Sequence, residues 1–122
     1  MKYGDLLGIR FTPHGRSKQD GFDCYGLAIE VLARNGIKLR DLYYESLKVS
    51  QEFVDELKLQ TEKLEKPEEN CIVEMESYGQ LGHMGVYIGE GLMIHTFIDT
   101  NVVIEPLSHY KNRIRGFYRV KN

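Results

Sequence analysis

From Cys71 onward, apolar and polar residues alternate with a period of two, which is typical of strands that bury one face. Glu90-Gly91 lies between two such segments and predicts a tight hairpin turn. Another turn is expected at 77–82, and a short polar helical turn near Ser108 to Asn112. The pattern predicts about five strands, at residues 71–76, 83–89, 92–97, 102–104 and 114–120.

The N-terminal half contains a segment whose apolar residues recur at helical spacing. Asp23 stands where an N-cap residue belongs, so the helix is expected to begin directly after it. Asn35-Gly36 predicts its end, because glycine accepts the left-handed conformation that closes many helices. The apolar stripe of this helix consists of Cys24, Leu27, Ala28, Val31 and Leu32.

A second helix is expected to start at Ser50, which can cap it, and to run to Leu64 before Lys66-Pro67 ends it. The remaining segments are less regular. Tyr3 to Leu7 could form a short helix. Residues 9–21 read as an exposed loop that leads to Cys24, and residues 37–49 show no clear period.

Helices come first and strands follow, which predicts an α+β fold whose N-terminal helices, including the one at Cys24, pack on a mostly antiparallel sheet. The chain has 122 residues, so we expect a single domain over residues 1–122. Hydrophobic residues make up 42% and charged residues 28%, which is typical of a folded globular protein.

The formal net charge is -2, with acidic and basic residues interspersed, and this disfavours binding to nucleic acid. No long apolar run is present, so neither a signal peptide nor insertion into a membrane is expected. We therefore expect cytoplasmic synthesis, and action outside the membrane would need another route of export.

The two cysteines, Cys24 and Cys71, are interpreted as free thiols, because two are few for a disulfide framework. Cys71 follows the strand alternation and is expected in the core. A zinc site built from these thiols with His83 and His95 is conceivable, but no pair has the short spacing of structural zinc ligands. We expect no metal and no cofactor.

Cys24 is the candidate nucleophile. A thiolate in the first turn of a helix faces the positive end of the helix dipole and unpaired N–H groups, which is expected to lower its pKa. The alternative is that Cys24 is only a small core residue on an apolar helix face.

His83 and His95 fall at comparable heights on the two strands of the predicted hairpin and could share a face. Gly85, beside His83, would let the Cys24 helix approach closely. Cys24 would then attack a carbonyl, His83 would carry the proton, and His95 would orient His83, with a thiolate–imidazolium pair at rest. The Cys24 N–H would stabilise the oxyanion.

Each histidine also has a plainer interpretation. His83 could be an exposed strand-edge residue, and His95 a buried ring bonded to a backbone carbonyl. His14 and Arg16 are expected to be solvated loop residues, and His109 to be inert in a polar turn.

Three short motifs together resemble the NlpC-type cysteine peptidases, a bacterial and phage branch of the papain-like superfamily. They are Gly21-Phe22-Asp23-Cys24-Tyr25-Gly26-Leu27, then Gly82-His83-Met84-Gly85-Val86-Tyr87-Ile88-Gly89, then Met93-Ile94-His95. The resemblance implies a papain-like fold with Cys24 as nucleophile, His83 as general base and acid, and His95 as the orienting residue. The implied substrate is the D-γ-glutamyl to diamino-acid bond of peptidoglycan stem peptides.

The resemblance also implies roles for residues near the nucleophile. Asp23 would help to read a free amine or order the loop. Tyr25, where many members carry serine, would shape the pocket, and Phe11 stands where many carry a tyrosine near the oxyanion position. The motif looks most like phage tail-associated or prophage members, so tail proteins are possible partners and the virion tail or cell wall possible sites of action. The alternatives are a tail-assembly or binding module without hydrolysis, and an amidase or acyltransferase acting on another substrate.

Overall fold

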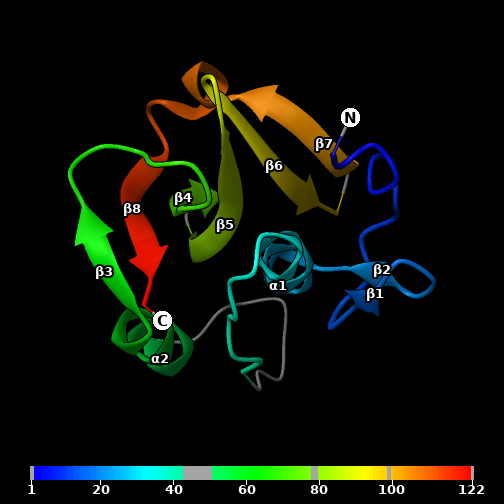
Figure 1. Ribbon diagram of the computed structural model, residues 1–122, viewed down its shortest axis with the longest axis horizontal. Helices are drawn as coiled ribbons and strands as arrows, with labels where there is room; N and C mark the ends of the chain where they lie inside the picture. The colour runs from blue at the N-terminus through cyan, green and yellow to red at the C-terminus, as the bar shows by residue number, and fades with distance from the viewer. Residues whose placement is uncertain (1, 43–50, 78–79, 99, 122) are drawn as a thin grey trace.

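The computed structural model describes residues 2–42, 51–77, 80–98 and 100–121. Two helices pack on a mostly antiparallel sheet, and a small two-stranded ladder precedes the first helix (Figure 1). In chain order the elements are β1 (Arg16–Ser17), β2 (Gly21–Phe22), α1 (Cys24–Arg34), α2 (Gln51–Leu59), β3 (Thr61–Leu64), β4 (Ile72–Ser77), β5 (Gln80–Gly89), β6 (Leu92–Phe97), β7 (Asn101–Pro106), the 3-10 helix η1 (Leu107–Tyr110) and β8 (Ile114–Val120).

The main sheet has the strand order β3-β8-β4-β5-β6-β7, and every neighbouring pair is antiparallel. Strands β4 to β7 follow one another as a meander, while β8 returns to lie between β3 and β4 (Figure 1). The predicted α+β fold with an antiparallel meander is confirmed. This sheet has six strands where about five were predicted, because residues 61–64, which were predicted to be helical, form β3.

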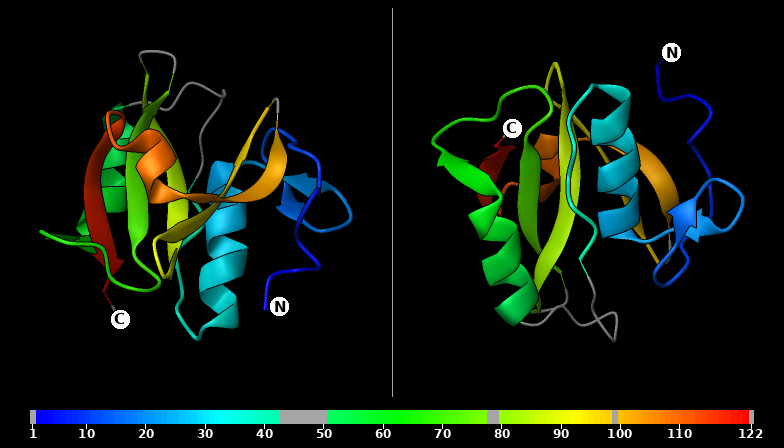
Figure 2. Two further views of the ribbon diagram at one scale, coloured as in Figure 1. Left: turned by 90° about the horizontal axis from the view of Figure 1, so that it is seen from above. Right: turned by 60° about the horizontal axis from the view of Figure 1, so that its bottom comes forward.

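Both faces of the sheet carry apolar clusters. On one face, Met84, Val86 and Ile94 pack with the buried stripe of α1, which lies across β5 and β6 (Figure 2). On the other face, Val73, Met75 and Met93 form a second cluster. Because side chains alternate along a strand, residues on β5 and β6 that point away from α1 face this second cluster.

Helix α1 forms as the sequence predicts. The Asp23 carboxylate accepts a hydrogen bond from the Gly26 N–H at 2.8 Å, and the helix closes at Asn35, followed by Gly36 with φ of +76°. The hairpin turn between β5 and β6 is confirmed as well. Glu90 and Gly91 both have positive φ, as a type I′ turn requires.

The second helix is shorter than predicted. Helix α2 ends at Leu59, and the Ser50 cap lies outside the described residues. Residues 61–64 form β3 instead of a last helical turn, since they pair with β8 from Thr61 opposite Val120 to Leu64 opposite Phe117. Helical spacing at Thr61 and Leu64 was therefore misleading, because pairing with a strand from the chain's end overrides a local pattern.

Two N-terminal predictions need correction. The expected loop at 9–21 contains β1 and meets β2 in a short ladder. Residues 2–8 form consecutive turns with the Leu6 N–H bonded to the Tyr3 carbonyl, not a helix. Residues 37–42 are irregular, as expected, and the rest of that segment lies outside the described residues. The predicted turn at 77–82 is shorter, because β4 continues to Ser77 and β5 starts at Gln80. Residues 78–79, between these two strands, lie outside the described residues.

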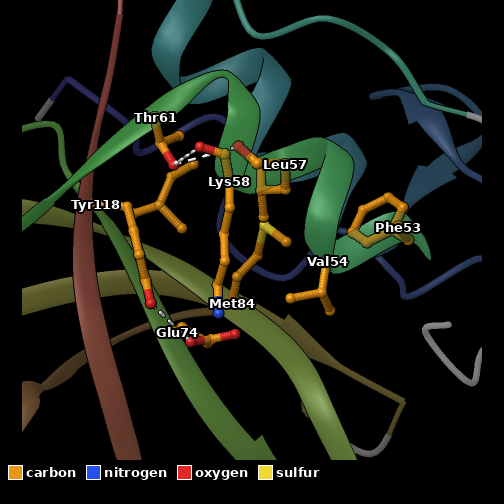
Figure 3. Close-up of a pocket in the computed structure, with 9 residues that line it drawn as sticks. Phe53, Val54, Leu57, Lys58, Thr61, Glu74, Met84 and Tyr118 are labelled. Carbon is orange, nitrogen blue, oxygen red and sulfur yellow. Dashed lines mark hydrogen bonds between the residues drawn. The ribbon is translucent and has the colours of Figure 1, made fainter. Parts of the chain in front are cut away.

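A small pocket lies between α2 and the sheet (Figure 3). Apolar side chains of Phe53, Val54 and Leu57 line it from the helix, and Met84 and Tyr118 from the strands. In the part of the chain that the structure describes, no helix is long and apolar enough to cross a membrane.

Candidate active site

Cys24 is the first residue of α1, directly after the capping Asp23. Its side chain is half-buried and packs against the apolar cluster between α1 and the sheet. The backbone N–H of Met84 in β5 forms a hydrogen bond with the thiol. The sulfur therefore lies against the strand residue that follows His83.

The thiol is not activated in the way the sequence predicts. Burial, with a smaller contribution from the negative charge of Asp23, raises the pKa of Cys24 to about 12. Backbone N–H groups of Met84, Tyr25 and Cys24 itself act in the opposite direction but do not compensate. The expectation of a lowered pKa is wrong because desolvation of the thiolate outweighs the helix terminus.

This raised pKa predicts slow alkylation of Cys24 by iodoacetamide at neutral pH. Only the thiolate reacts, and roughly a thousandfold less of it is present at pH 7 than for an exposed cysteine. The rate constant is expected to rise about tenfold per pH unit between pH 7 and 9. Peptide mapping by mass spectrometry separates Cys24 from Cys71. A rate that is already high and constant from pH 6 to 8 would instead indicate a resting thiolate–imidazolium pair.

The two strand histidines are in direct contact. His83 Nε2 lies 3.3 Å from His95 Nδ1, which confirms that the two rings share a face of the sheet. The His83 ring stacks on Phe97 with centroids 3.9 Å apart, and Phe97 also meets the edge of His95 at 5.0 Å. His95 is fully buried. These contacts hold both rings in fixed orientations.

Both imidazoles are neutral at pH 7. Burial, with a smaller contribution from the neighbouring His95, lowers the pKa of His83 to about 3. Burial also lowers the pKa of His95, against the opposing effect of Glu105. The predicted resting ion pair is therefore corrected to a neutral thiol and two neutral imidazole rings.

Glu105 and Tyr110 extend this cluster, and sequence reasoning missed both. His95 Nε2 lies 2.8 Å from Glu105 Oε2, and the Tyr110 hydroxyl donates to the same oxygen. The alternation along β7 places Glu105 on the face of Val103, which pairs with His95. That signal needed the register of β6 and β7, which the sequence of their connection does not fix.

The structure gives a different reason for a glycine at position 85 than the predicted close approach of the Cys24 helix. A side chain there would meet Met93 Sδ at 2.8 Å and His95 Cβ at 3.0 Å. The glycine thus makes room for β6 side chains on the histidine face. The backbone of α1 packs on the other face of β5 and does not use this space.

Asp23 joins the preceding segment to α1. Its carboxylate accepts from the His14 N–H at 3.0 Å and from Arg16 Nη1 at 2.8 Å, in addition to the Gly26 N–H. Arg16 also contacts Asp41 at 3.1 Å, so it is not the solvated residue that the sequence suggests. His14 is exposed. Asp23 orders this loop, while its reading of a substrate amine stays a prediction.

Tyr25 is a buried core residue of α1. Its side chain is 1% exposed, its ring meets Phe53 edge-on, and its hydroxyl donates to the Arg40 carbonyl. This placement does not agree with the expected contact between Tyr25 and substrate, because so buried a side chain offers no surface to a ligand. Phe11 is half-buried, and its N–H donates to Asn101 Oδ1.

Cys71, His109 and the conceivable zinc site are the remaining candidates from the sequence. Cys71 is 1% exposed, so its predicted place in the core is confirmed, and both thiols are free, as expected. His109 is exposed in η1. Among the described residues, no group of three or more His, Cys, Asp or Glu side chains is arranged to hold a metal ion.

Comparison with known proteins gives a family and a fold. The family model described as the NlpC/P60 family matches residues 8–119. A Staphylococcus aureus structure, described as similar to a lipoprotein of the NLP/P60 family, is 20% identical with a TM-score of 0.70, covering 99% of this chain and 39% of its own. NlpC2 from Trichomonas vaginalis is 18% identical with a TM-score of 0.70, covering 94% of this chain and 42% of its own.

The NlpC/p60 domain of the peptidoglycan hydrolase SagA is 19% identical with a TM-score of 0.63, covering 99% of this chain and 93% of that domain. No protein with a curated description matches significantly. The chain spans 36–42% of the length of three of the matched structures. At these identities the structures show a shared fold.

Proposed function

The chain belongs to the NlpC/P60 family, whose members are usually cysteine peptidases, and from this premise we propose that it hydrolyses peptide bonds in peptidoglycan stem peptides. The bond we propose is the one between D-γ-glutamate and the diamino acid. Cys24 is the nucleophile, His83 the general base and acid, and His95 the residue that orients His83.

One observation carries this proposal. The 3.3 Å contact between His83 Nε2 and His95 Nδ1 leaves only Nδ1 of His83 to exchange a proton with another group. The Cys24 sulfur interacts with the N–H of the next residue, Met84. The thiol thus bonds to the strand residue next to the one that carries the free imidazole nitrogen, and this proximity along β5 supports pairing Cys24 with His83 as nucleophile and base.

In the acylation step, the Cys24 sulfur forms a bond to the scissile carbonyl carbon as its proton passes to His83. Proton transfer during attack suits a thiol whose pKa is about 12, because a free thiolate is costly in this site. The Cys24 N–H at the helix start donates to the oxyanion. The tetrahedral intermediate then expels the amine, which takes the proton from His83, and a thioester remains.

In the deacylation step, His83 removes a proton from water as the water oxygen attacks the thioester carbonyl. Collapse of this second intermediate breaks the carbon–sulfur bond and releases the carboxylic acid, which then loses its proton to solvent. The Cys24 sulfur takes back the proton from His83. No oxidant, reductant or metal enters this sequence.

Mass spectrometry of a peptidoglycan digest tests whether the protein cleaves the bond between D-γ-glutamate and the diamino acid. Purified sacculi are incubated with the protein, and soluble fragments are compared with those from a buffer control. An endopeptidase shortens the stem peptide after D-γ-glutamate, and the new fragment begins with the free amine of the diamino acid. An amidase or acyltransferase would leave the stem peptide intact, and that outcome would overturn the proposed bond.

The phage-tail association is a separate part of the proposal. It is supported by the aromatic Tyr25 after the nucleophile, while none of the matched structures named above is described as a phage protein. Tail proteins as partners and the virion tail or cell wall as the site of action therefore stay predictions.

A further inference from the structure

The contact between His83 and His95 does not by itself decide which ring nitrogen of each histidine carries a proton. A neutral imidazole has one N–H donor and one acceptor, so either ring could donate in this contact. If His95 Nδ1 donated, His83 would accept at Nε2 and carry its own proton at Nδ1. His83 could not then take a proton from Cys24 at that atom.

Glu105 removes this ambiguity. An ionised carboxylate can only accept hydrogen bonds, so the 2.8 Å contact requires His95 Nε2 to be the donor. Burial raises the pKa of Glu105, but hydrogen bonds from Tyr110 and His95 outweigh this and keep the carboxylate ionised at neutral pH. A neutral His95 protonated at Nε2 has a lone pair on Nδ1. His83 must therefore donate from Nε2 and keep a lone pair on Nδ1.

We propose that Glu105 is a positioning residue that sets the tautomers of both histidines and so leaves the Nδ1 lone pair of His83 available for the Cys24 proton. Its consequence for catalysis rests on the proposed function. The tautomers themselves are a property of the free protein.

Tyr110 supports Glu105 in this role. Its hydroxyl donates to the same Oε2 that faces His95, and its ring meets His95 edge-on at 5.2 Å. The Glu105 side chain is 27% exposed, so this bond holds a carboxylate that could otherwise turn toward water. Strand β7 and η1 thus bring one acid and one phenol to the far side of His95.

A second glutamate–tyrosine pair in the same sheet provides a matched control. The Tyr118 hydroxyl on β8 donates to Glu74 Oε1 on β4 at 3.2 Å (Figure 3). Lys58 lies over the ring of Tyr118, 5.7 Å from its centroid. Glu74→Ala removes the same chemical group from a tyrosine partner and is expected to leave both histidine tautomers unchanged.

The first test is long-range ¹H–¹⁵N NMR of the four histidine rings in the full chain at pH 7.5, assigned by single substitutions. We expect His83 and His95 both to be protonated at Nε2. In Glu105→Ala, His95 should lose this single tautomer, whereas Glu105→Gln should retain it because the amide oxygen still accepts. Glu105→Leu repeats the test if the alanine variant does not fold. Unchanged tautomers without an acceptor at 105, or an equal change in Glu74→Ala, would overturn the inference.

The second test is turnover of a soluble stem peptide. Glu105→Ala is expected to lower kcat by about 10- to 100-fold with little change in KM, since the residue acts through His95 and does not touch substrate. Glu105→Gln should restore part of the loss. If the wild-type chain cleaves no stem peptide but the tautomers behave as expected, the proposed function fails and the tautomer assignment stands. If the wild type cleaves but its tautomers are independent of Glu105, the proposed function stands and the tautomer assignment fails.

Discussion

Cys24→Ala is expected to reduce the release of shortened stem peptides by more than about 10³-fold. The substitution removes the sulfur that would form the thioester in the proposed mechanism, and the helix start that holds it needs no thiol, because Asp23 caps α1. Alanine also fits the apolar surroundings, so the variant is expected to fold. Product release from sacculi or a soluble stem peptide, followed by mass spectrometry, measures the effect.

Cys71→Ala is the matched control for this prediction. It removes the other free thiol, which is buried directly before β4 and is far in sequence from Cys24. Its turnover should stay close to that of the wild type after correction for the folded fraction. Hydrolysis that survives in Cys24→Ala would exclude covalent catalysis by this thiol. A chain that never hydrolyses but binds peptidoglycan equally well with either residue at 24 would be a binding module.

Local chemistry predicted the elements that carry the site. Asp23 predicted the start of α1, and Glu90-Gly91 predicted the turn that brings His83 and His95 to one face. These features depend on a few neighbouring residues, so the sequence contains nearly all the information needed. The family resemblance rests on the same motifs, and the match over residues 8–119 confirms it.

Features that depend on distant partners could not be predicted in this way. Residues 61–64 become a strand because β8, at the end of the chain, offers an unpaired edge. Glu105 reaches His95 only through the register of β6 against β7. No local pattern contains either fact.

The electrostatics of the thiol were mispredicted for a related reason. A helix N-terminus favours a thiolate, and the sequence shows this terminus directly. Desolvation disfavours a thiolate, and it depends on how closely β5 packs over Cys24. The second effect is larger here, so the thiol is neutral at rest and no thiolate–imidazolium pair is stored.

His83→Asn is expected to lower turnover by more than about 10²-fold, because asparagine can accept a hydrogen bond but cannot take and return the thiol proton at neutral pH. KM should change little if His83 acts on the reacting atoms alone. Its measurement is the turnover of a soluble stem peptide at pH 7.5. His109→Asn removes an exposed histidine from η1 and should leave turnover unchanged.

His83→Asn should also make the free energy of unfolding less sensitive to acid. The pKa of His83 is lowered to about 3 in the folded chain, so below about pH 6.5 the unfolded chain binds a proton that the folded chain does not. Stability is thus fully present above pH 6.5 and falls as the pH drops toward 3. This one group removes about 2 to 3 kcal/mol between pH 7 and 4.5.

Denaturant titrations at pH 7.5, 6.0 and 4.5 measure this loss as a change in the free energy of unfolding. Asparagine also removes the ring that stacks on Phe97, so the variant is expected to have a lower free energy of unfolding than the wild type at pH 7.5. The informative quantity is the slope of the free energy of unfolding against pH, which should be shallower in His83→Asn than in the wild type. A wild-type slope retained without His83 would mean that this imidazole is not held neutral by burial, and the neutral resting pair would have to be abandoned.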